Sequence, residues 1–227
     1  MAGGFLSSSL RFINLAWSAA QRSSNECALN ETARSSNPLV SIVFSVAACE
    51  AFISELAEFA GVAANEYGGR IPPEPESVLM FKSLYDEVEA SKGSLNSKYI
   101  LGFGLFSGRP INKGGAPYQD FALLLDLRNS LVHIKLDRIM LDDTNTALMK
   151  YPPIVGKLRS REILAPLPGP NVTESWVSVV STPAVARWCV KSATSMIVGL
   201  ISVIPDGRLK HQMDFLYLEE FNALISA

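Results

Sequence analysis

The chain has 227 residues, of which 48% are hydrophobic and 13 are prolines, so a sizeable core is expected and a fibrous or disordered chain is excluded. The 20 basic and 22 acidic residues nearly cancel, which argues against a protein that holds nucleic acid through a broad positive field. Any contact with a polyanion is therefore expected to be local.

Cysteine usage and hydropathy together predict a soluble, cytoplasmic protein. The cysteines at 27, 49 and 189 are odd in number and lack the paired spacing of a zinc site or a disulfide framework. Residues 1–21 have no basic leader before a continuous apolar stretch, so they are a poor signal peptide. The apolar run 192–204 is shorter than the roughly 20 residues that cross a bilayer, so no membrane partner is expected.

The first part of the chain has a helical pattern over residues 5–21. Serine-rich stretches at 23–25 and 35–38 indicate breaks. We therefore expect an N-terminal helix that ends before residue 23.

Asn37 followed by Pro38 is typical of a helix start, with a cap residue and then proline in the first turn. A long helix is predicted over 38–65, because glycines and prolines follow it. Apolar residues at helical spacing predict the next helix over 76–90.

A shorter helix is expected over 94–106, followed by a loop at 107–117 and a helix over 118–136. Residues 140–175 are rich in Pro, Gly, Asp and Asn, which predicts an irregular insertion with one short helix. The SWVSVV that ends at residue 180 is typical of a short strand or extended stretch.

Thr182 is expected to cap a helix over 183–203, and a final helix is predicted over 208–225. The fold class is therefore all-α, with one domain over residues 1–227. The expected bundle consists of four helices: 38–65, 76–90, 118–136 and 183–203.

The sequence LLDLRNSLVHIK, residues 124–135, sets Arg128, Asn129 and His133 in a leucine-rich helical run. Burying such groups costs free energy unless they are compensated, so they are either satisfied within the fold or take part in chemistry. An arginine with asparagine beside it and histidine five residues later resembles the signature of the HEPN superfamily. These are small all-helical proteins, many of which are metal-independent ribonucleases.

The sequence FSVAACEAFISELAEFA, residues 44–60, resembles the long first helix of that family, in which a glutamate, here Glu50, interrupts small and apolar residues. The resemblance extends over roughly residues 38–205. It implies a HEPN-like bundle of four to five core helices, with the insertion and the terminal helices added, and neither a metal nor a cofactor.

Five polar residues share one narrow arc of an ideal helix: Asp126, Asn129, Ser130, His133 and Asp137. Arg128 points nearly the opposite way, among leucines. Either the helix is distorted there, or Arg128 reaches around it, or an acid holds Arg128 from behind.

Glu50 is the candidate acid, since it follows the apolar stripe of its helix, where an unpaired carboxylate is unfavourable. A buried pair of Glu50 with Arg128 would satisfy both groups, either as a structural pair or to orient the guanidinium toward a phosphate. Glu55 and Glu58 are interpreted as ordinary surface charges.

If the resemblance holds, RNA supplies the nucleophile, its 2′-hydroxyl. Cleavage then needs a base, an acid and positive charge on the phosphorane. Histidine is suited to proton transfer, whereas Arg128 and the Asn129 amide are suited to the non-bridging oxygens. One chain offers one motif histidine, and HEPN proteins typically dimerise around a shared cleft. We therefore expect a homodimer and a 2′,3′-cyclic phosphate product.

The basic cluster KLRSR is interpreted as a solvated loop that also offers RNA contacts through Lys157, Arg159 and Arg161. The leading hypothesis is a HEPN-type endoribonuclease that acts as a toxin or antiphage effector, held in check by an antitoxin or another regulatory partner. One alternative is a noncatalytic HEPN module that dimerises and binds a nucleotide, RNA or protein. Another is a helical scaffold with a core pair of Glu50 and Arg128.

Overall fold

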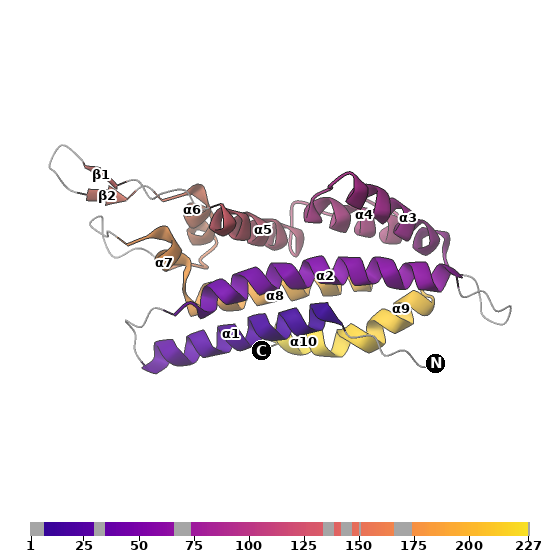
Figure 1. Cartoon of the computed structure of the whole chain (residues 1–227), viewed down its shortest axis with the longest axis horizontal. Coiled ribbons are helices and arrows are strands. Elements are labelled where there is room, and N and C mark those ends of the chain that lie inside the picture. The colour runs from indigo at the N-terminus through magenta and orange to yellow at the C-terminus, as the bar shows by residue number, and fades with distance from the viewer. Residues whose placement is uncertain are drawn as a thin grey trace. The chain divides into compact units, whose positions relative to one another are not determined.

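The structure is a computed structural model that describes residues 7–29, 35–65, 74–133, 139–141, 147–149, 151–165 and 174–226. Helices dominate it (Figure 1), which confirms the predicted all-α class. The HEPN-like form of the bundle stays a prediction.

The chain groups into two compact units. Unit 1 consists of residues 1–13, 47–122 and 192–227, and unit 2 consists of residues 14–46 and 123–191. The helices α1 (Ser8–Leu29), α2 (Asn37–Asn65), α5 (Tyr118–Val132) and α8 (Pro183–Ser202) each contribute residues to both units. The single domain over residues 1–227 stays a prediction.

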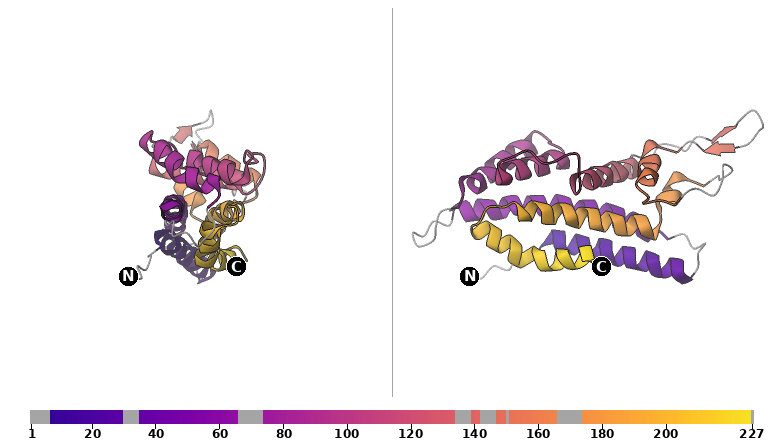
Figure 2. Two further views of the ribbon diagram at one scale, coloured as in Figure 1. Left: turned by 90° about the vertical axis from the view of Figure 1, so that its right-hand side faces the viewer. Right: turned by 180° about the vertical axis from the view of Figure 1, so that it is seen from behind.

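Unit 1 contains a helical hairpin of α3 (Glu76–Ala90) and α4 (Leu95–Ser107), which lie against one another in Figures 1 and 2. The α4 helix begins where the Ser94 hydroxyl accepts the Ser97 N–H at 3.1 Å. The predicted helices 76–90 and 94–106 are therefore confirmed to within a residue.

Aromatic rings fill the core of unit 1. The Phe81 and Phe106 centroids lie 4.9 Å apart, and those of Tyr99 and Phe121 lie 4.8 Å apart. The Tyr99 hydroxyl is fully buried and donates to the Cys49 carbonyl at 3.1 Å, so its polar end is satisfied.

Glu55 caps the start of α1 in unit 1. Its carboxylate accepts the backbone N–H groups of Ser8 at 2.6 Å and Ser9 at 3.1 Å, together with the Ser9 hydroxyl at 2.6 Å. The Tyr217 hydroxyl donates to the same carboxylate at 2.8 Å, and burial raises the pKa of Tyr217. A carboxylate at a helix N-terminus satisfies orphan N–H groups and complements the helix dipole. The interpretation of Glu55 as ordinary surface charge is therefore wrong.

Glu74 caps the start of the C-terminal segment of unit 1. This segment comprises α9 (Arg208–Met213), the π-helical η1 (Asp214–Leu218) and α10 (Glu219–Ser226). The Glu74 side chain is buried, and its Oε1 accepts the N–H of Arg208 at 2.7 Å and of Leu209 at 3.3 Å. The predicted helix 208–225 therefore exists, and its start is fixed by a residue more than a hundred positions earlier.

Unit 2 combines parts of α1, α2, α5 and α8 with α6 (Pro153–Ser160) and α7 (Trp176–Val180). A two-stranded antiparallel hairpin, β1 (Ile139–Leu141) and β2 (Ala147–Met149), precedes α6. In Figure 2 the hairpin extends away from α6. The predicted insertion over residues 140–175 does contain its short helix, α6, and the strands are additional.

One predicted break and one predicted strand are wrong. The α1 helix continues through residues 23–25, where the Ser24 hydroxyl donates to the Ala20 carbonyl at 3.1 Å, one turn back, and accepts from Arg187 at 2.7 Å, so it is satisfied without interrupting the helix. Residues 176–180 are helical instead of extended, since Trp176, Val179 and Val180 are buried at helical spacing.

Of the two predicted caps, one is confirmed. The Thr182 hydroxyl accepts the Val185 N–H at 3.3 Å at the start of α8. The Asn37 amide instead donates to the Glu26 carboxylate at 3.0 Å, and the Ser35 hydroxyl accepts the Asn37 N–H. Asn37 therefore ties α2 to α1 instead of capping α2.

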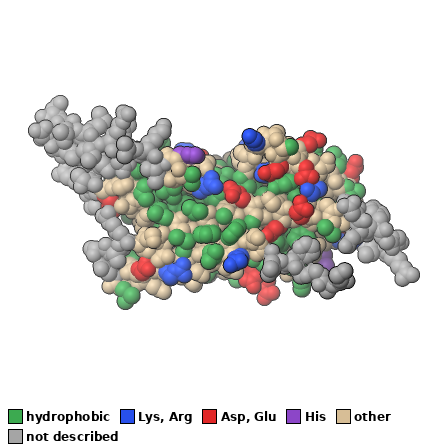
Figure 3. Space-filling view, in the orientation of Figure 1, with side chains coloured by type: hydrophobic (Ala, Val, Ile, Leu, Met, Phe, Trp, Pro, Cys, Tyr) green, Lys and Arg blue, Asp and Glu red, His purple; other side chains and the backbone are tan. Residues whose placement is uncertain are grey.

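By length and composition, residues 37–63 of α2 and the whole of α8 are apolar enough to cross a membrane, a test that core helices of soluble proteins also pass. Half of the α2 window and 61% of the α8 window are buried within the protein. Figure 3 shows acidic side chains among hydrophobic ones on the face of the molecule turned to the viewer. Glu50 and Glu58 are exposed on α2.

Candidate active site

The buried leucines of α5 determine how the helix is oriented. Leu123, Leu124 and Leu127 are at most 4% exposed, so their side of the helix belongs to the core. Asp126 and Asn129 lie on the other side and are exposed. This division follows from helical periodicity, and it places the polar arc predicted from the sequence at the surface.

His133 lies in the turn that ends α5, and its side chain is exposed. Its N–H donates to the Asn129 carbonyl at 3.0 Å, so helical geometry extends to the histidine. Residues four apart on a helix are neighbours, and the Asn129 and His133 side chains therefore share one face, one turn apart. Asp137 and the end of the predicted helix 118–136 lie outside the described residues.

Arg128 is half-buried, and its Nη1 donates to the Asn129 Oδ1 at 3.2 Å. The α5 helix is regular through Val132, so distortion does not bring the guanidinium to the asparagine. The contact joins neighbouring residues, so an arginine that reaches around the helix and an arginine held by an acid both stay predictions.

Glu50 is exposed, so the expected burial of this carboxylate is wrong. It lies at the edge of the apolar stripe of α2, where Val46 and Ile53 are buried but Val43 is 41% exposed. A buried pair of Glu50 with Arg128 is therefore not formed, and the hypothesis of a helical scaffold that depends on such a pair in the core is not supported. The pairing itself stays a prediction.

The α6 helix faces α5, and residues of both helices line one cavity. It begins with a Pro-Pro pair and packs through Ile154, Val155 and Leu158, each at most 4% exposed. This packing leaves Lys157 on the outer side, where its Nζ lies 2.8 Å from the Asp126 Oδ2. KLRSR is therefore mostly helical, not a loop.

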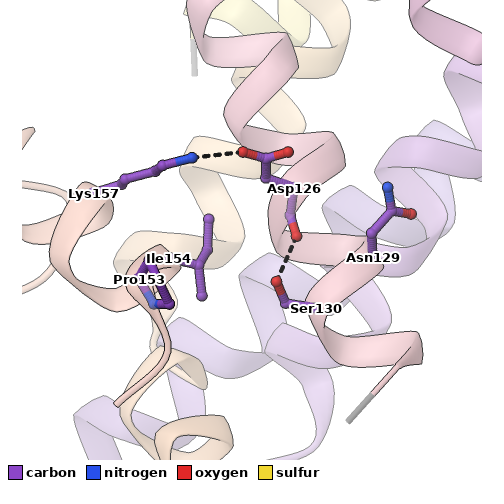
Figure 4. Close-up of a pocket in the computed structure, with 6 residues that line it drawn as sticks. All are labelled: Asp126, Asn129, Ser130, Pro153, Ile154 and Lys157. Carbon is purple, nitrogen blue, oxygen red and sulfur yellow. Dashed lines mark hydrogen bonds and ion pairs between the residues drawn. The ribbon is translucent and has the colours of Figure 1, made fainter. Parts of the chain in front are cut away.

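A cavity of about 360 Å³ lies between α5 and α6. It is lined by Asp126, Asn129, Ser130, Pro153, Ile154 and Lys157. Figure 4 shows Lys157 and Asp126 extending toward one another across the gap, with Ile154 and Pro153 facing α5. In the same view the Asn129 side chain points away from Lys157, and its amide oxygen accepts a hydrogen bond from Arg128 at 3.2 Å.

The other two residues of the predicted RNA-binding cluster lie elsewhere. The Arg159 guanidinium carbon lies 5.7 Å from the centroid of the Tyr151 ring, which is cation–π range, and the Tyr151 hydroxyl donates to the Glu174 carbonyl at 3.1 Å. The Arg159 side chain therefore packs on the Tyr151 ring. Arg161 is exposed just after the helix. Of the three basic residues, Lys157 is the one that lines the cavity.

Sequence reasoning assigned no role to Asp126 and missed its pairing with Lys157. The only available signal was the position of Asp126 three residues before Asn129 and seven before His133, on the same arc. Lys157 is 31 residues further on, beyond the insertion, so spacing alone could not pair the two.

Among the described residues, no group of three or more His, Cys, Asp or Glu side chains is arranged to hold a metal ion. Comparison of the chain with protein-family models, curated proteins and solved structures found no match. The functional interpretation therefore depends on the residues and on their geometry.

Proposed function

We propose that the protein is a metal-independent endoribonuclease, with Arg128, Asn129 and His133 as its catalytic residues. The observation that carries the proposal is the geometry of the α5 end. Asn129 and His133 are exposed on one face, one turn apart, and the guanidinium of Arg128 bonds the Asn129 amide. These are a proton-transfer group and two donors suited to phosphate oxygens.

The reaction follows from these groups. One imidazole accepts the proton of the RNA 2′-hydroxyl as the 2′-oxygen forms a bond to phosphorus. The bond from phosphorus to the 5′-oxygen then breaks, and an imidazolium donates the proton that the leaving oxygen needs. Arg128 and Asn129 donate to the non-bridging oxygens, where negative charge develops. Each proton-transfer group contributes about 10²- to 10⁴-fold.

The active species is a homodimer in this proposal, because separate base and acid roles need two histidines. The end of α5 offers apolar surface for such a contact, since Val132 is 56% exposed next to His133. A second copy in contact here brings its own His133 to the same cleft.

The test is cleavage of single-stranded RNA by the purified protein in EDTA, with a 2′,3′-cyclic phosphate product. His133→Ala is expected to abolish cleavage and leave the dimer intact. His211→Ala is the matched control, because His211 is the other histidine in the chain and is exposed on α9. Cleavage by His133→Ala at the wild-type rate, or no cleavage by the wild type, contradicts the proposal.

The second candidate function is a noncatalytic module that binds a nucleotide or RNA, and the cavity between α5 and α6 favours it. RNA binding without cleavage by the wild type supports this alternative.

The proposed ribonuclease is expected to act as a toxin or antiphage effector that an antitoxin or another regulatory partner holds in check. Its expression without that partner is then expected to arrest growth. Arg128→Ala is then expected to relieve the arrest.

A further inference from the structure

We infer that the cavity between α5 and α6 binds a guanine base, with Asp126 and Lys157 as the residues that recognise it. The inference deepens the proposed function and rests on it for RNA as the ligand. It concerns the nucleotide beside the scissile phosphate, and so the position at which the RNA is cut.

The ion pair of Asp126 and Lys157 contributes little to the fold. Both side chains are 56% exposed, and water and salt screen an exposed pair. The pair nevertheless holds a carboxylate and an ammonium 2.8 Å apart at the edge of a cavity. An acceptor and a donor at this separation can be shared with a ligand.

The four bases differ in the donors and acceptors that they present to such a pair. Guanine presents two adjacent donors, N1–H and the N2 amine, next to the O6 acceptor. A carboxylate can accept both donors while an ammonium donates to O6 or N7. Adenine and cytosine present one amine next to a ring-nitrogen acceptor, and uracil has a single N–H between two carbonyls. Asp126 beside Lys157 therefore fits guanine best.

The shape of the site also suits a base. Ile154 and Pro153 give the cavity an apolar wall on α6, against which the face of a base can lie (Figure 4). The Ser130 hydroxyl donates to the Asp126 carbonyl at 2.8 Å and keeps acceptor capacity for a ribose hydroxyl. A volume of about 360 Å³ lies within the range of small-molecule sites.

The cavity and His133 lie close together along the axis of α5. A rise of about 1.5 Å per residue separates Ser130 from His133 by about 4.5 Å, and Asp126 from His133 by about 10.5 Å. A base in the cavity and a phosphate at His133 can therefore belong to the same nucleotide or to adjacent ones.

The test uses the full-length protein and measures the binding of GMP, AMP, CMP, UMP and inorganic phosphate by calorimetry. GMP is expected to bind about 10- to 100-fold more tightly than the other ligands, which is the range of discrimination of a good bidentate contact. Asp126→Asn is expected to remove this preference, because an amide presents a donor to the guanine donors. Asp86→Asn is the matched control, since Asp86 forms a similar surface pair with Lys82 at 2.7 Å on α3.

Cleavage of an RNA with a single guanosine separates this inference from the proposed function. Cleavage by the wild type next to that guanosine, together with cleavage by Asp126→Asn that no longer prefers this position, supports the guanine site and the ribonuclease. Cleavage without base preference, together with equal binding of the four nucleotides, overturns the guanine site and leaves the ribonuclease. Selective GMP binding without cleavage supports the site and overturns the enzyme. Phosphate binding as tight as GMP binding overturns the site.

Discussion

In unit 1, the carboxylates of Glu55 and Glu74 accept hydrogen bonds from backbone N–H groups at the starts of α1 and α9. In unit 2, the carboxylate of Asp126 pairs with Lys157 at the surface, beside a cavity. The same kind of group thus stabilises helix ends in one region and faces solvent in the other.

This difference separates residues that hold the fold from residues that are available to a ligand. A carboxylate that satisfies buried helix donors is costly to remove, because the donors are left without partners. An exposed pair is cheap to remove, because water replaces each partner. Variants of the two kinds are therefore expected to affect different measurements.

The largest effect on stability is expected for Glu55→Ala. Backbone and hydroxyl donors at the α1 start lose their acceptor, and charged hydrogen bonds contribute about 1.5–3 kcal/mol each. We expect a loss of about 3 kcal/mol in the free energy of unfolding, measured in urea. Glu58→Ala, one turn along α2 with a 71% exposed side chain, is the control and is expected to be nearly neutral. Equal losses in the two variants would contradict the capping role.

A smaller loss is expected for Gly207→Ala. A Cβ atom at Gly207 would lie 2.5 Å from the Glu74 Oε2, so the cap of α9 must shift, at a cost of about 1–3 kcal/mol. Gly104→Ala in α4 is the matched control, because nothing lies within 4 Å of its added Cβ. That substitution is expected to stabilise the protein by about 0.5–1 kcal/mol. Stabilisation by Gly207→Ala would sink this account of the Glu74 cap.

Thiol reactivity gives a test that leaves the sequence unchanged. Cys27 is exposed, whereas Cys49 and Cys189 are buried. Burial raises the pKa of Cys49 to about 12, and it also raises the pKa of Cys189. We expect one thiol to react rapidly at pH 8 in the native protein and all the cysteines to react in denaturant. Rapid modification of a second thiol under native conditions would mean that this core opens readily.

The sign of the pH dependence follows from the same burial. The native state keeps the Cys49 proton up to a higher pH than the unfolded chain does. Its contribution to stability is complete below about pH 9 and is lost as the pH rises toward about 12. Urea midpoints measured on either side of pH 9 are expected to fall at the higher pH, and a constant or rising midpoint would contradict this.

The smallest effect on stability is expected for Asp126→Asn. The side chain is 56% exposed, so the melting temperature is expected to shift by no more than about 2 °C. A large shift would place Asp126 among the residues that hold the fold, as Glu55 is, and would end the contrast between the units.

The elements with a strong helical period could be predicted from the sequence. The helix over 76–90 was placed to the residue, since its apolar positions recur on one face and a proline precedes it. The exposed arc of α5 was predicted for the same reason. The helix over residues 176–180 was not predicted, because its β-branched valines favour a strand locally. Burial of Trp176, Val179 and Val180 at helical spacing outweighs that local preference.

The long-range polar contacts could not be predicted. Glu55 meets Ser9 across 46 positions and Tyr217 across 162, and no local pattern announces either contact. Glu50 was misjudged because α2 is apolar around most of its circumference, so the side that faces solvent is poorly marked by the sequence.

The most direct test of the account is the rate of RNA cleavage in EDTA by the wild type and by Arg128→Ala, with the melting temperature of each protein measured alongside. The account predicts cleavage by the wild type, a loss of at least about 100-fold in the variant, and melting temperatures within about 2 °C. Unfolding of the variant, or cleavage at the wild-type rate, would contradict the claim that this face of α5 acts on a ligand.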